Sequence, residues 1–478
     1  MSPLPASLQL KPFAKSGAMK VQTNILEPTF INTKHARFVL ERRAILASDS
    51  IFTFSLTTGI PMNWSEDASP FLPVNTGIAA LIKSCTLRLG NVVVSRTQDW
   101  NHYDTLAKSF QNPETRTLQG SVTSGRLDTL RPSPLTDGKM AMQNARYSAN
   151  NAAEAPVQLD LTRTPVFTVK LSELFPALRG LQIPLGHMDD QMVVELEFVT
   201  QTFANKGVLV NLNENPPQPA NAAFWTWQVV PASVTMVCDH LSFSDETHEE
   251  IDDLVHGGKG LTMPFSEIVT ILGSIPPVPG TPQAGQLNTT SVTQELGLAG
   301  RTVKSIVVAD TLISPLDDWA SLPAAYRMNS RIIQGSTQVK VNDQNVFPQP
   351  ITSVTHHITE IESAMGSPLY VSRAEYDQGA CIKFGPGNMV IPIPQIDNNV
   401  SFCGKAMSTL QGLRHCEGVS LIADPVSRRG TKIRDKPIEY SRTIKRTYDE
   451  AQFAYNSRYY CEVEKAFQIK DGRVSVMV

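Results

Sequence analysis

The pattern of polar and apolar residues first indicates a β-hairpin. Polar and apolar residues alternate through Thr86–Leu89, and the β-branched run Val92–Val94 follows. Alternation of this kind is typical of strands with one buried face, and β-branched residues favour extended backbone. Gly90 and Asn91 between the two runs can adopt the positive φ that tight hairpin turns require. We therefore predict a strand, a tight turn and a returning strand.

A helix is predicted directly after this hairpin. From Trp100 onward the period changes, and apolar residues recur every three or four positions: Trp100, Tyr103, Leu106, Ala107 and Phe110. This spacing gives a helix one apolar face, and Asp99 is a candidate N-cap for its first turn. Aromatic side chains on such a face usually pack in a core, so we expect the helix to close one end of a β-sandwich.

Further segments of the first half read mainly as strands. The runs "SIFTFSLTTG" (residues 50–59) and "QMVVELEFVT" (residues 191–200) alternate, and so does "ASVTMVCDHLSF" (residues 232–243). Period-two alternation predicts strands with one face in the core. A short helical turn is expected at Leu171–Leu178, and Pro176 and Pro184 interrupt the segment,.

The clearest boundary in the chain is a charged helix within residues 244–262. Thr247 with Glu250 three positions later matches a capping box, and Gly257 with Gly258 would end the helix,. Ile251, Leu254 and Val255 supply an apolar stripe. We interpret residues 244–262 as a solvated linker helix; its His248-Glu249 pair lacks the second histidine of a zinc-protease motif.

The second half repeats the first in outline, with a predicted strand, a polar turn at Asn342–Asn345, a returning strand and a helix. The offset from the first hairpin is about 250 residues, and a duplicated β-domain accounts for it economically. Chance similarity between two strand-rich halves is the alternative. We predict β-domains at residues 31–243 and 263–478, preceded by a flexible N-terminal arm of residues 1–30.

Charge and cysteine usage narrow the function. The net charge of −3 gives no basic footprint for nucleic acid, so no sequence-specific nucleic-acid partner is expected,. The arm carries Lys11, Lys15 and Lys20 and no acid before Glu27, so it is expected to order only in an assembly,. The six cysteines are scattered and read as reduced, buried thiols,. The start of the chain lacks a signal-peptide core, and no run is long enough for a membrane helix, so we expect a product that is not secreted.

A search for catalytic chemistry gives no candidate site. Phosphate-binding loops, nucleophile elbows and calcium loops are all absent from the sequence,. Cys403, His415 and Cys416 do not match a zinc spacing, and His356-His357 is interpreted as structural. Three acidic pairs read as solvated: Asp189-Asp190, Asp252-Asp253 and Asp317-Asp318. We predict no catalytic residues, no metal, no cofactor and no enzymatic activity.

Several runs together resemble the double jelly-roll major capsid proteins of eukaryotic DNA viruses, most closely those of polinton-like viruses and virophages. In the first half they are "RFVLERRAILASDS", "PVNTGIAALIKSCTLRLGNVVVSRTQDWNHYDTL" and "LSELFPALRGLQIPLG". In the second half they are "LGLAGRTVKSIVV", "VKVNDQNVFP" and "YYCEVEKAFQIKDGRVSV". The similarity lies in the order and spacing of these runs, since none of them is a catalytic motif.

This resemblance implies an all-β fold of two consecutive eight-stranded antiparallel jelly rolls, with short helices in the connections. It implies a major capsid protein whose homotrimers form pseudo-hexagonal capsomers that tile an icosahedral shell. The implied partners are neighbouring capsomers, penton and minor capsid proteins, and the resemblance allows the arm to contact the genome or an internal membrane. The protein would be assembled inside the host cell and reside in the virion.

Two alternatives remain open. A carbohydrate-binding β-sandwich would need exposed aromatic platforms, for which Trp225 and Trp227 are the candidates. A minor vertex capsid protein of the same virus type usually has one jelly roll, so two repeating halves argue against it.

Two segments are candidates for assembly contacts. The basic stretch Arg428–Arg446 contains only Asp435 and Glu439 as acids, and we hypothesise that it contacts a neighbouring subunit or the particle interior; a solvated loop is the alternative. Gly273–Gly300 contains Pro276, Pro277, Pro279 and Pro282, which cannot donate ladder hydrogen bonds,. We predict a long loop there, on the outward rim of the second domain, that locks a trimer.

Overall fold

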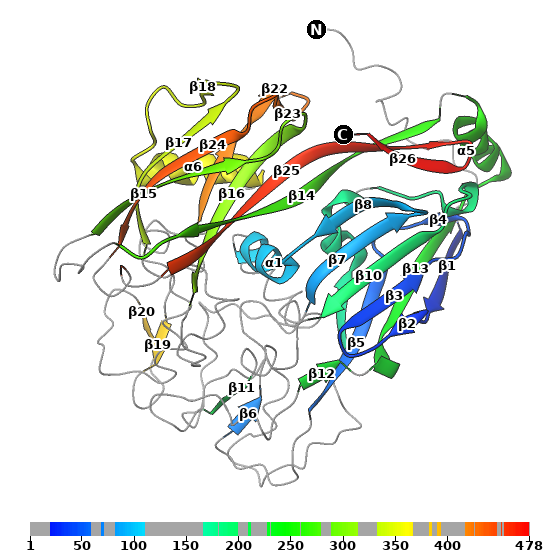
Figure 1. Cartoon of the computed structure of the whole chain (residues 1–478). Helices are drawn as coiled ribbons and strands as arrows, with labels where there is room; N and C mark the ends of the chain where they lie inside the picture. Colours follow the sequence, from blue (N-terminus) through cyan, green and yellow to red (C-terminus); the bar gives the residue numbers. More distant parts are fainter. Residues whose placement is uncertain are drawn as a thin grey trace.

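Antiparallel sheets account for most of the structure, with separate sheets in each half of the chain (Figure 1). This computed structural model describes residues 20–58, 68–70, 82–109, 166–179, 181–198, 209–211, 227–229, 231–258, 260–278, 288–313, 332–366, 382–384, 390–392, 416–424, 426–446, 451 and 454–477. The predicted β-rich fold is confirmed for these residues.

Two sheets form the first half. One contains β1 (Lys20–Leu26), β13 (Thr235–Ser242), β5 (Ile51–Thr58) and β12 (Trp227–Val229), with β4 (Ile45–Leu46) on β13 and β9 (Val166–Lys170) on β5. The other contains, in order, β2 (Phe30–Ile31), β3 (His35–Val39), β10 (Met192–Phe198), β7 (Ile82–Leu89) and β8 (Val92–Thr97).

Two sheets also form the second half. One contains β14 (Leu261–Ile275), β25 (Ala454–Lys470), β16 (Thr302–Ile313), β23 (Arg429–Lys432) and β22 (Ile422–Asp424), with β21 (Glu417–Ser420) on β16 and β26 (Arg473–Met477) on β25. The other contains β15 (Asn288–Leu296), β24 (Ile438–Arg446), β17 (Ile332–Val341) and β18 (Gln344–Asn345).

Short elements complete the described chain. Two-stranded sheets are formed by β6 (Ala68–Pro70) with β11 (Leu209–Asn211) and by β19 (Ile382–Phe384) with β20 (Val390–Pro392). The α-helices are α1 (Trp100–Ser109), α3 (Leu171–Leu174), α5 (Asp245–His256) and α6 (Val354–Met365). The 3₁₀ helices are η4 (Pro176–Leu178), η5 (Leu185–His187) and η6 (Pro231–Ser233).

The two halves repeat one strand plan. In chain order, β1, β3, β5, β7, β8, β9, β10 and β13 correspond to β14, β15, β16, β17, β18, β21, β24 and β25. The ladders correspond as well: β1·β13 and β14·β25, β5·β13 and β16·β25, β5·β9 and β16·β21, β3·β10 and β15·β24, β7·β10 and β17·β24, β7·β8 and β17·β18. A helix follows the hairpin in both halves, α1 after β8 and α6 after β18.

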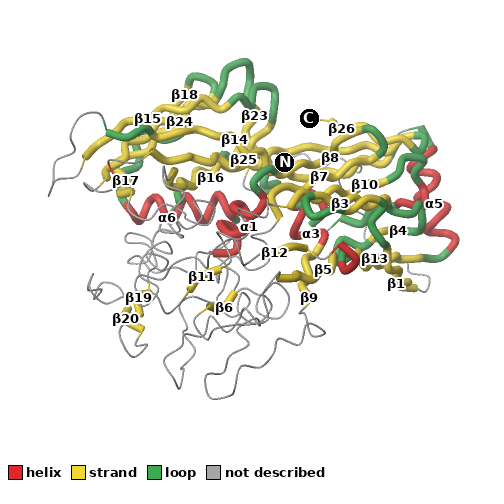
Figure 2. Tube along the Cα trace, turned by 60° about the horizontal axis from the view of Figure 1, so that its bottom comes forward, coloured by secondary structure: helices red, strands yellow, loops and turns green. Residues whose placement is uncertain are grey.

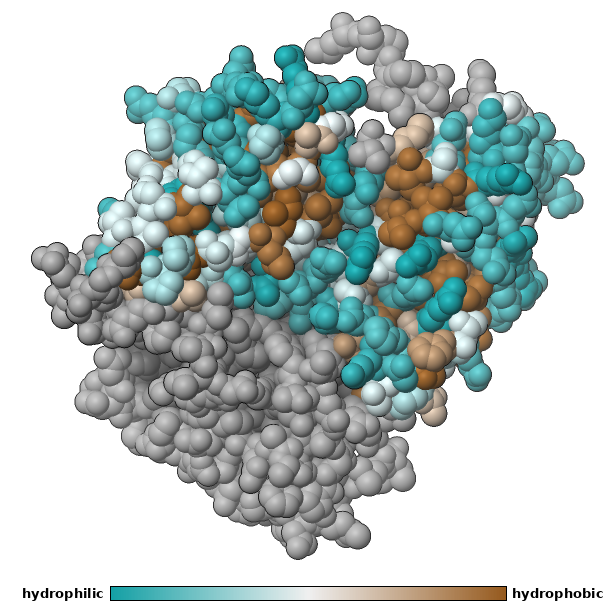
Figure 3. Space-filling model, viewed as in Figure 1, coloured by the Kyte–Doolittle hydropathy of each residue, from teal (hydrophilic) through white to brown (hydrophobic). Residues whose placement is uncertain are grey.

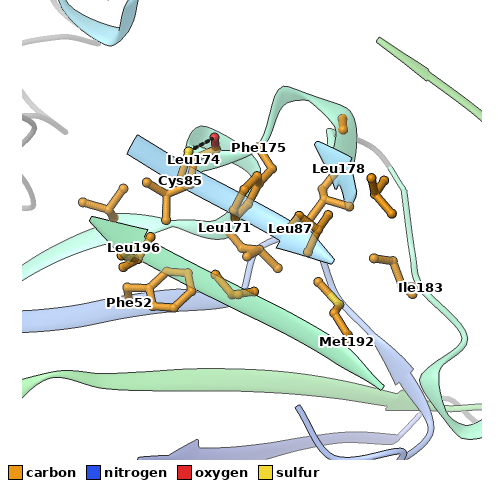
Figure 4. Packing of buried hydrophobic residues seen from close by; sticks show 14 of the residues in the cluster. Phe52, Cys85, Leu87, Leu171, Leu174, Phe175, Leu178, Ile183, Met192 and Leu196 are labelled. Atoms are coloured by element: carbon orange, nitrogen blue, oxygen red, sulfur yellow. Dashed lines mark hydrogen bonds between the residues drawn. The ribbon is translucent and has the colours of Figure 1, made fainter. Parts of the chain in front are cut away.

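The core of the first half lies between its two sheets. Alternate residues of β10 point inward, so Met192, Val194 and Leu196 are buried while Glu195 and Glu197 stay partly exposed,. Figure 4 shows Phe52, Cys85, Leu87 and Leu196 packed with the apolar residues of α3 and η4. The predicted helical turn at Leu171–Leu178 thus covers one end of this core. Cys85 Sγ donates a hydrogen bond to the carbonyl oxygen of Leu174 at 3.1 Å.

The hairpin and the helix that follows it form as predicted. Gly90 has a φ of +56°, and β7 pairs with β8 around it. Trp100 and Leu106 on α1 are fully buried, and the indole nitrogen of Trp100 donates to the carbonyl oxygen of Glu173 at 3.3 Å. The second hairpin turns at Asn342 and Asp343, both at positive φ. It is therefore a two-residue turn, shorter than the predicted Asn342–Asn345.

The boundary helix starts and packs differently from the prediction. Its N-cap is Ser244, whose hydroxyl lies 3.2 Å from that of Thr247, so Thr247 is inside the helix instead of capping it. Ile251 and Val255 are buried as expected, but Leu254 is 49% exposed. The buried face of α5 is therefore narrower than the predicted apolar stripe, because it excludes Leu254.

Two predicted loop segments contain strands. Lys20–Leu26, within the predicted arm, pairs with β13 along its whole length. The prediction of a flexible arm is wrong for this segment, because a strand can pair through its backbone without being apolar. Asn288–Leu296, within the predicted loop Gly273–Gly300, pairs with β24. Its β-branched residues favour a strand, and burial alternates along it; the prolines interrupt the sheet earlier, at Pro276 and Pro277,. Residues 1–19 and 279–287 lie outside the described residues.

Candidate functional site at the junction of the two halves

Two long strands of the second half extend over the first half. Figure 1 shows β14 and β25 running on from their own sheet to a position above β8. At this end Phe265 of β14 and Phe467 and Ile469 of β25 are buried in the same apolar cluster as the core of the first half. The second half thus supplies part of the first half's core, which makes the two halves difficult to separate.

A tight turn at the end of β25 locks into the first half. The backbone amide of Asp189 donates to the carbonyl oxygen of Gly472 at 2.7 Å, and the amide of Val474 donates to Asp190 Oδ2 at 2.8 Å. Gly472 has a φ of +72°, and a Cβ there would lie 2.6 Å from Asp189 Oδ2, so only glycine fits,. The acidic pair Asp189-Asp190, predicted to be merely solvated, therefore holds this turn.

The start of α1 forms a second point of attachment. Asp99 Oδ2 accepts a hydrogen bond from Arg458 Nε of β25 at 3.1 Å, and Thr270 of β14 donates to the carbonyl oxygen of Gln98 at 3.2 Å. The rings of Tyr103 and Tyr460 lie 5.4 Å apart. The predicted capping role of Asp99 falls to its backbone, because its carbonyl oxygen accepts the amides of the helix's first turn while its carboxylate binds the other half.

A histidine pair attaches α5 to the first half. His187 Nδ1 lies 2.6 Å from Asp252 Oδ1, and His187 Nε2 lies 2.9 Å from His248 Nδ1. The two rings stack, and the backbone amide of Phe243 donates to His248 Nε2 at 3.3 Å. The linker helix is thus bound along one side, which its acidic sequence did not indicate. Among the described residues no group of three or more His, Cys, Asp or Glu side chains is placed to hold a metal.

A buried ion pair joins the two sheets of the second half. Arg442 of β24 forms two hydrogen bonds to Asp310 of β16, of 2.7 and 2.6 Å, and a third to Ser457 Oγ at 2.6 Å. Glu417 of β21 lies 3.6 Å from the same guanidinium. Burial raises the pKa of Glu417, although Arg442 opposes the shift. Burial also disfavours the charge on Arg442, but Asp310 and Glu417 outweigh it, so the pKa of Arg442 is well above its usual value.

The basic stretch Arg428–Arg446 divides into internal and external residues. Arg442 and Arg446 are buried, and Arg446 Nη2 donates to Pro276 O at 2.9 Å and to Thr290 Oγ1 at 2.8 Å. The hypothesis of a contact with a neighbouring subunit or the particle interior is therefore wrong for these two, which are buried within the chain. The exposed cations of the stretch are Arg428, Arg429, Lys432, Arg434, Lys436 and Lys445.

Other candidates from the sequence are dispersed. Cys85, Cys238, Cys416 and Cys461 are buried free thiols, as predicted, and burial raises the pKa of Cys238 to about 12. His356 and His357 lie on α6, where His356 is exposed and His357 is buried. Trp227 belongs to β12. Cys403, His415, Trp225 and Asp317-Asp318 lie outside the described residues.

The junction consists of interlocked strands, backbone hydrogen bonds and ion pairs. These contacts resist separation of the two halves. The sequence did not indicate Arg458, Gly472 or Asp310 as junction or inter-sheet residues; the turn pair Asp471-Gly472 was the available signal. No helix in the described part of the chain has the length and hydrophobicity needed to cross a membrane.

Comparison with known proteins gives matches by structure alone. No protein-family model matches the sequence, and no curated protein matches it. A chain from the structure of the Sputnik virophage aligns with a TM-score of 0.55 at 9% identity, covering 100% of this chain and 93% of its own. A chain from the capsid of the virus PBCV-1 aligns with a TM-score of 0.52 at 12% identity, and the coverage is 96% of each chain. The PBCV-1 protein VP54, fitted into a reconstruction of Sputnik, aligns with a TM-score of 0.51 at 11% identity, again with 96% of each chain covered.

These alignments span both halves in one match, and they agree with the duplicated ladders. The chain has a double jelly-roll fold. Within this double jelly roll, α1 and α6 occupy equivalent places, and Figure 2 shows them on the same side of the strands. The resemblance inferred from the order and spacing of the sequence runs is confirmed at the level of the fold.

Proposed function

We propose that this chain is a major capsid protein, a structural subunit of an icosahedral virus shell. Its domains would be a first jelly roll ending at residue 243, a linker containing α5 at residues 244–260, and a second jelly roll that starts with β14 at Leu261, two residues before the predicted 263. Because β1 begins at Lys20, the first roll would start there and not at residue 31. The structural neighbours from the PBCV-1 capsid and the Sputnik virophage support the proposal.

The repeated ladder plan is the observation that carries this proposal. One chain offers two similar blocks, so three copies offer six similar blocks around a threefold axis,. Such a trimer would have a nearly hexagonal outline, and hexagonal blocks can tile a flat facet. The subunit would be built for this task only if its two rolls kept a fixed relative position.

The junction supports that requirement. Contacts at both ends of the interface hold β25 and β26 on the first half, through Asp99 at α1 and through Asp190 beside η5. Apolar residues of β14 and β25 are buried between these points. We infer that the role is mechanical and not enzymatic. The partners would be further copies of the chain, then penton and minor capsid proteins, and the location would be the virion.

Purified protein tests the proposal directly. Sedimentation equilibrium should give the mass of a trimer, and negative-stain images should show particles with a hexagonal outline that assemble into shells as the concentration rises. A chain that stays monomeric and forms no shells at any concentration or salt would contradict it.

A further inference from the structure

Two exposed apolar side chains lie at different corners of the fold, one among acidic residues and one where cations outnumber carboxylates. Leu254 on α5 is 49% exposed, and Val426, in the segment between β22 and β23, is 84% exposed. An apolar side chain surrounded by charged residues has the arrangement of a small contact surface, with an apolar centre and a polar rim. The two surfaces differ in the sign of the rim.

The surface around Leu254 is acidic. Glu250 lies one helical turn before Leu254 and Asp253 directly precedes it, and both are exposed,. Exposed carboxylates also occur at Asp245, Glu246, Glu249 and Asp252. Asp252 contacts His187. Within the described ranges, the other carboxylates of α5 have no cation at ion-pair distance.

The surface around Val426 is basic. Its exposed cations are Arg428, Arg429, Lys432, Arg434 and Lys436, and they outnumber two exposed carboxylates, Asp424 and Asp435. Asp424 Oδ1 accepts the backbone amide of Val426 at 3.0 Å. Lys436 pairs with Asp343. As far as the structure describes the chain, the other four have no carboxylate at ion-pair distance. We call residues 426–436 the basic turn.

The two surfaces cannot meet within one chain. Figures 1 and 2 both place α5 at the outer end of the first roll and β23 at the second roll, well apart. Both lie along the upper side of Figure 1, where Figure 3 shows mainly hydrophilic surface. Copies placed side by side, with the second roll of one against the first roll of the next, would bring the two surfaces together.

We propose that the basic turn of one copy docks on α5 of a second copy. Val426 would pack against Leu254, and Arg428 and Arg429 would face Glu250 and Asp253. Each copy uses one surface for each neighbour, so the contact is head to tail and can close into a ring. The inference rests on the proposed capsid function and specifies a contact that joins neighbouring subunits. Attraction between opposite charges speeds association and disfavours incorrect relative positions of the two copies, and salt weakens this attraction.

A charge-swap experiment on the full chain tests this contact. One variant carries Arg428→Glu and Arg429→Glu, a second carries Glu250→Lys and Asp253→Lys, and a third carries all four changes. Sedimentation at low and high salt gives the dissociation constant of the oligomer. Each two-residue variant should associate at least about tenfold more weakly, because like charges would then face each other. The four-residue variant should recover most of the wild-type affinity.

Controls separate this contact from general charge effects and from misfolding. Lys445→Glu and Glu27→Lys reverse exposed charges elsewhere and should leave association unchanged. Circular dichroism and thermal unfolding should match the wild type in every variant. If a charge variant misfolds, Leu254→Ser and Val426→Ser replace it, and each should weaken association without a change of charge.

The outcomes distinguish this inference from the capsid proposal. If the wild type forms trimers and shells but the two-residue variants associate as well as it does, the docking contact is wrong and the capsid function stands. A four-residue variant that stays as weak as its parents also overturns the contact. A wild type that is monomeric under all conditions overturns both.

Discussion

Replacing Arg442 by methionine should destabilise the second roll strongly. The change removes the guanidinium that links β24 to Asp310 on β16 and to Ser457 on β25, across the two sheets. Asp310 is only 4% exposed. In the variant its carboxylate would keep the hydrogen bond from Ser457 Oγ, of 2.6 Å, but would lose both bonds and the opposite charge of Arg442.

The size of the effect follows from the buried carboxylate that is left behind. Breaking a buried pair by removing one partner costs about 3–5 kcal/mol. For a unit of about 150–250 residues, each kcal/mol lowers the melting temperature by roughly 2–4 °C, so we expect a fall of roughly 6–20 °C. Removing both charges should cost less, because Arg442→Met with Asp310→Leu leaves no Asp310 carboxylate without its partner and replaces that pair with apolar volume. Glu417, which also lies beside Arg442, keeps its hydrogen bonds from Thr337 Oγ1 and the Tyr440 hydroxyl.

Differential scanning calorimetry of the wild type, both single variants and the double variant measures this difference. We expect the wild type and the double variant to have the highest melting temperatures, in either order, and Arg442→Met to melt well below both. A fall of less than about 2 °C for Arg442→Met would refute the reasoning, since even the smallest expected penalty exceeds it. A double variant less stable than Arg442→Met would show that the pair contributes more than the cost of its burial.

Three further predictions test the interior and the junction. The pKa of Glu417 is higher in the folded state than in the unfolded state, so this residue contributes stability below its unfolded pKa, and that stability is lost as the pH rises through its folded pKa,. When the pH is raised from about 4 to about 8, the melting temperature of Glu417→Gln should therefore fall less than that of the wild type. Gly472→Ala should speed hydrogen exchange in β26 by loosening the turn against Asp189, whereas Gly300→Ala, which has a φ of +80° but no atom within 4 Å of the added Cβ, should leave β26 exchange unchanged. Burial raises the thiol pKa of Cys238 and of Cys461 to about 12, so maleimide should label both far more slowly in the native state than in urea; equal rates would contradict their burial,.

The sequence alone determined the local elements. Alternation predicted β5, β10 and β13, and the turn residues Gly90-Asn91 and Asn342–Asn345 marked both hairpins, although only Asn342 and Asp343 form the second turn. These features depend on neighbouring residues: the strand period, the positive φ of a turn and the apolar face of a helix. The duplication could be seen in the sequence for the same reason, because a similar series of strand, turn and helix patterns recurs at a fixed offset.

Only the tertiary structure decided which distant residues meet. Lys20–Leu26 has little apolar character directed at the core, and it is a strand because β13 offers it a free edge. Arg442 and Arg446 look like solvated cations in the sequence. In the structure they donate hydrogen bonds to the Asp310 carboxylate and the Pro276 carbonyl oxygen, which lie far away along the chain. Asp190 holds β26 only because the fold brings the end of β25 back onto the first roll. Pairing across such distances depends on geometry that no local pattern encodes, so the junction could not be predicted from the sequence.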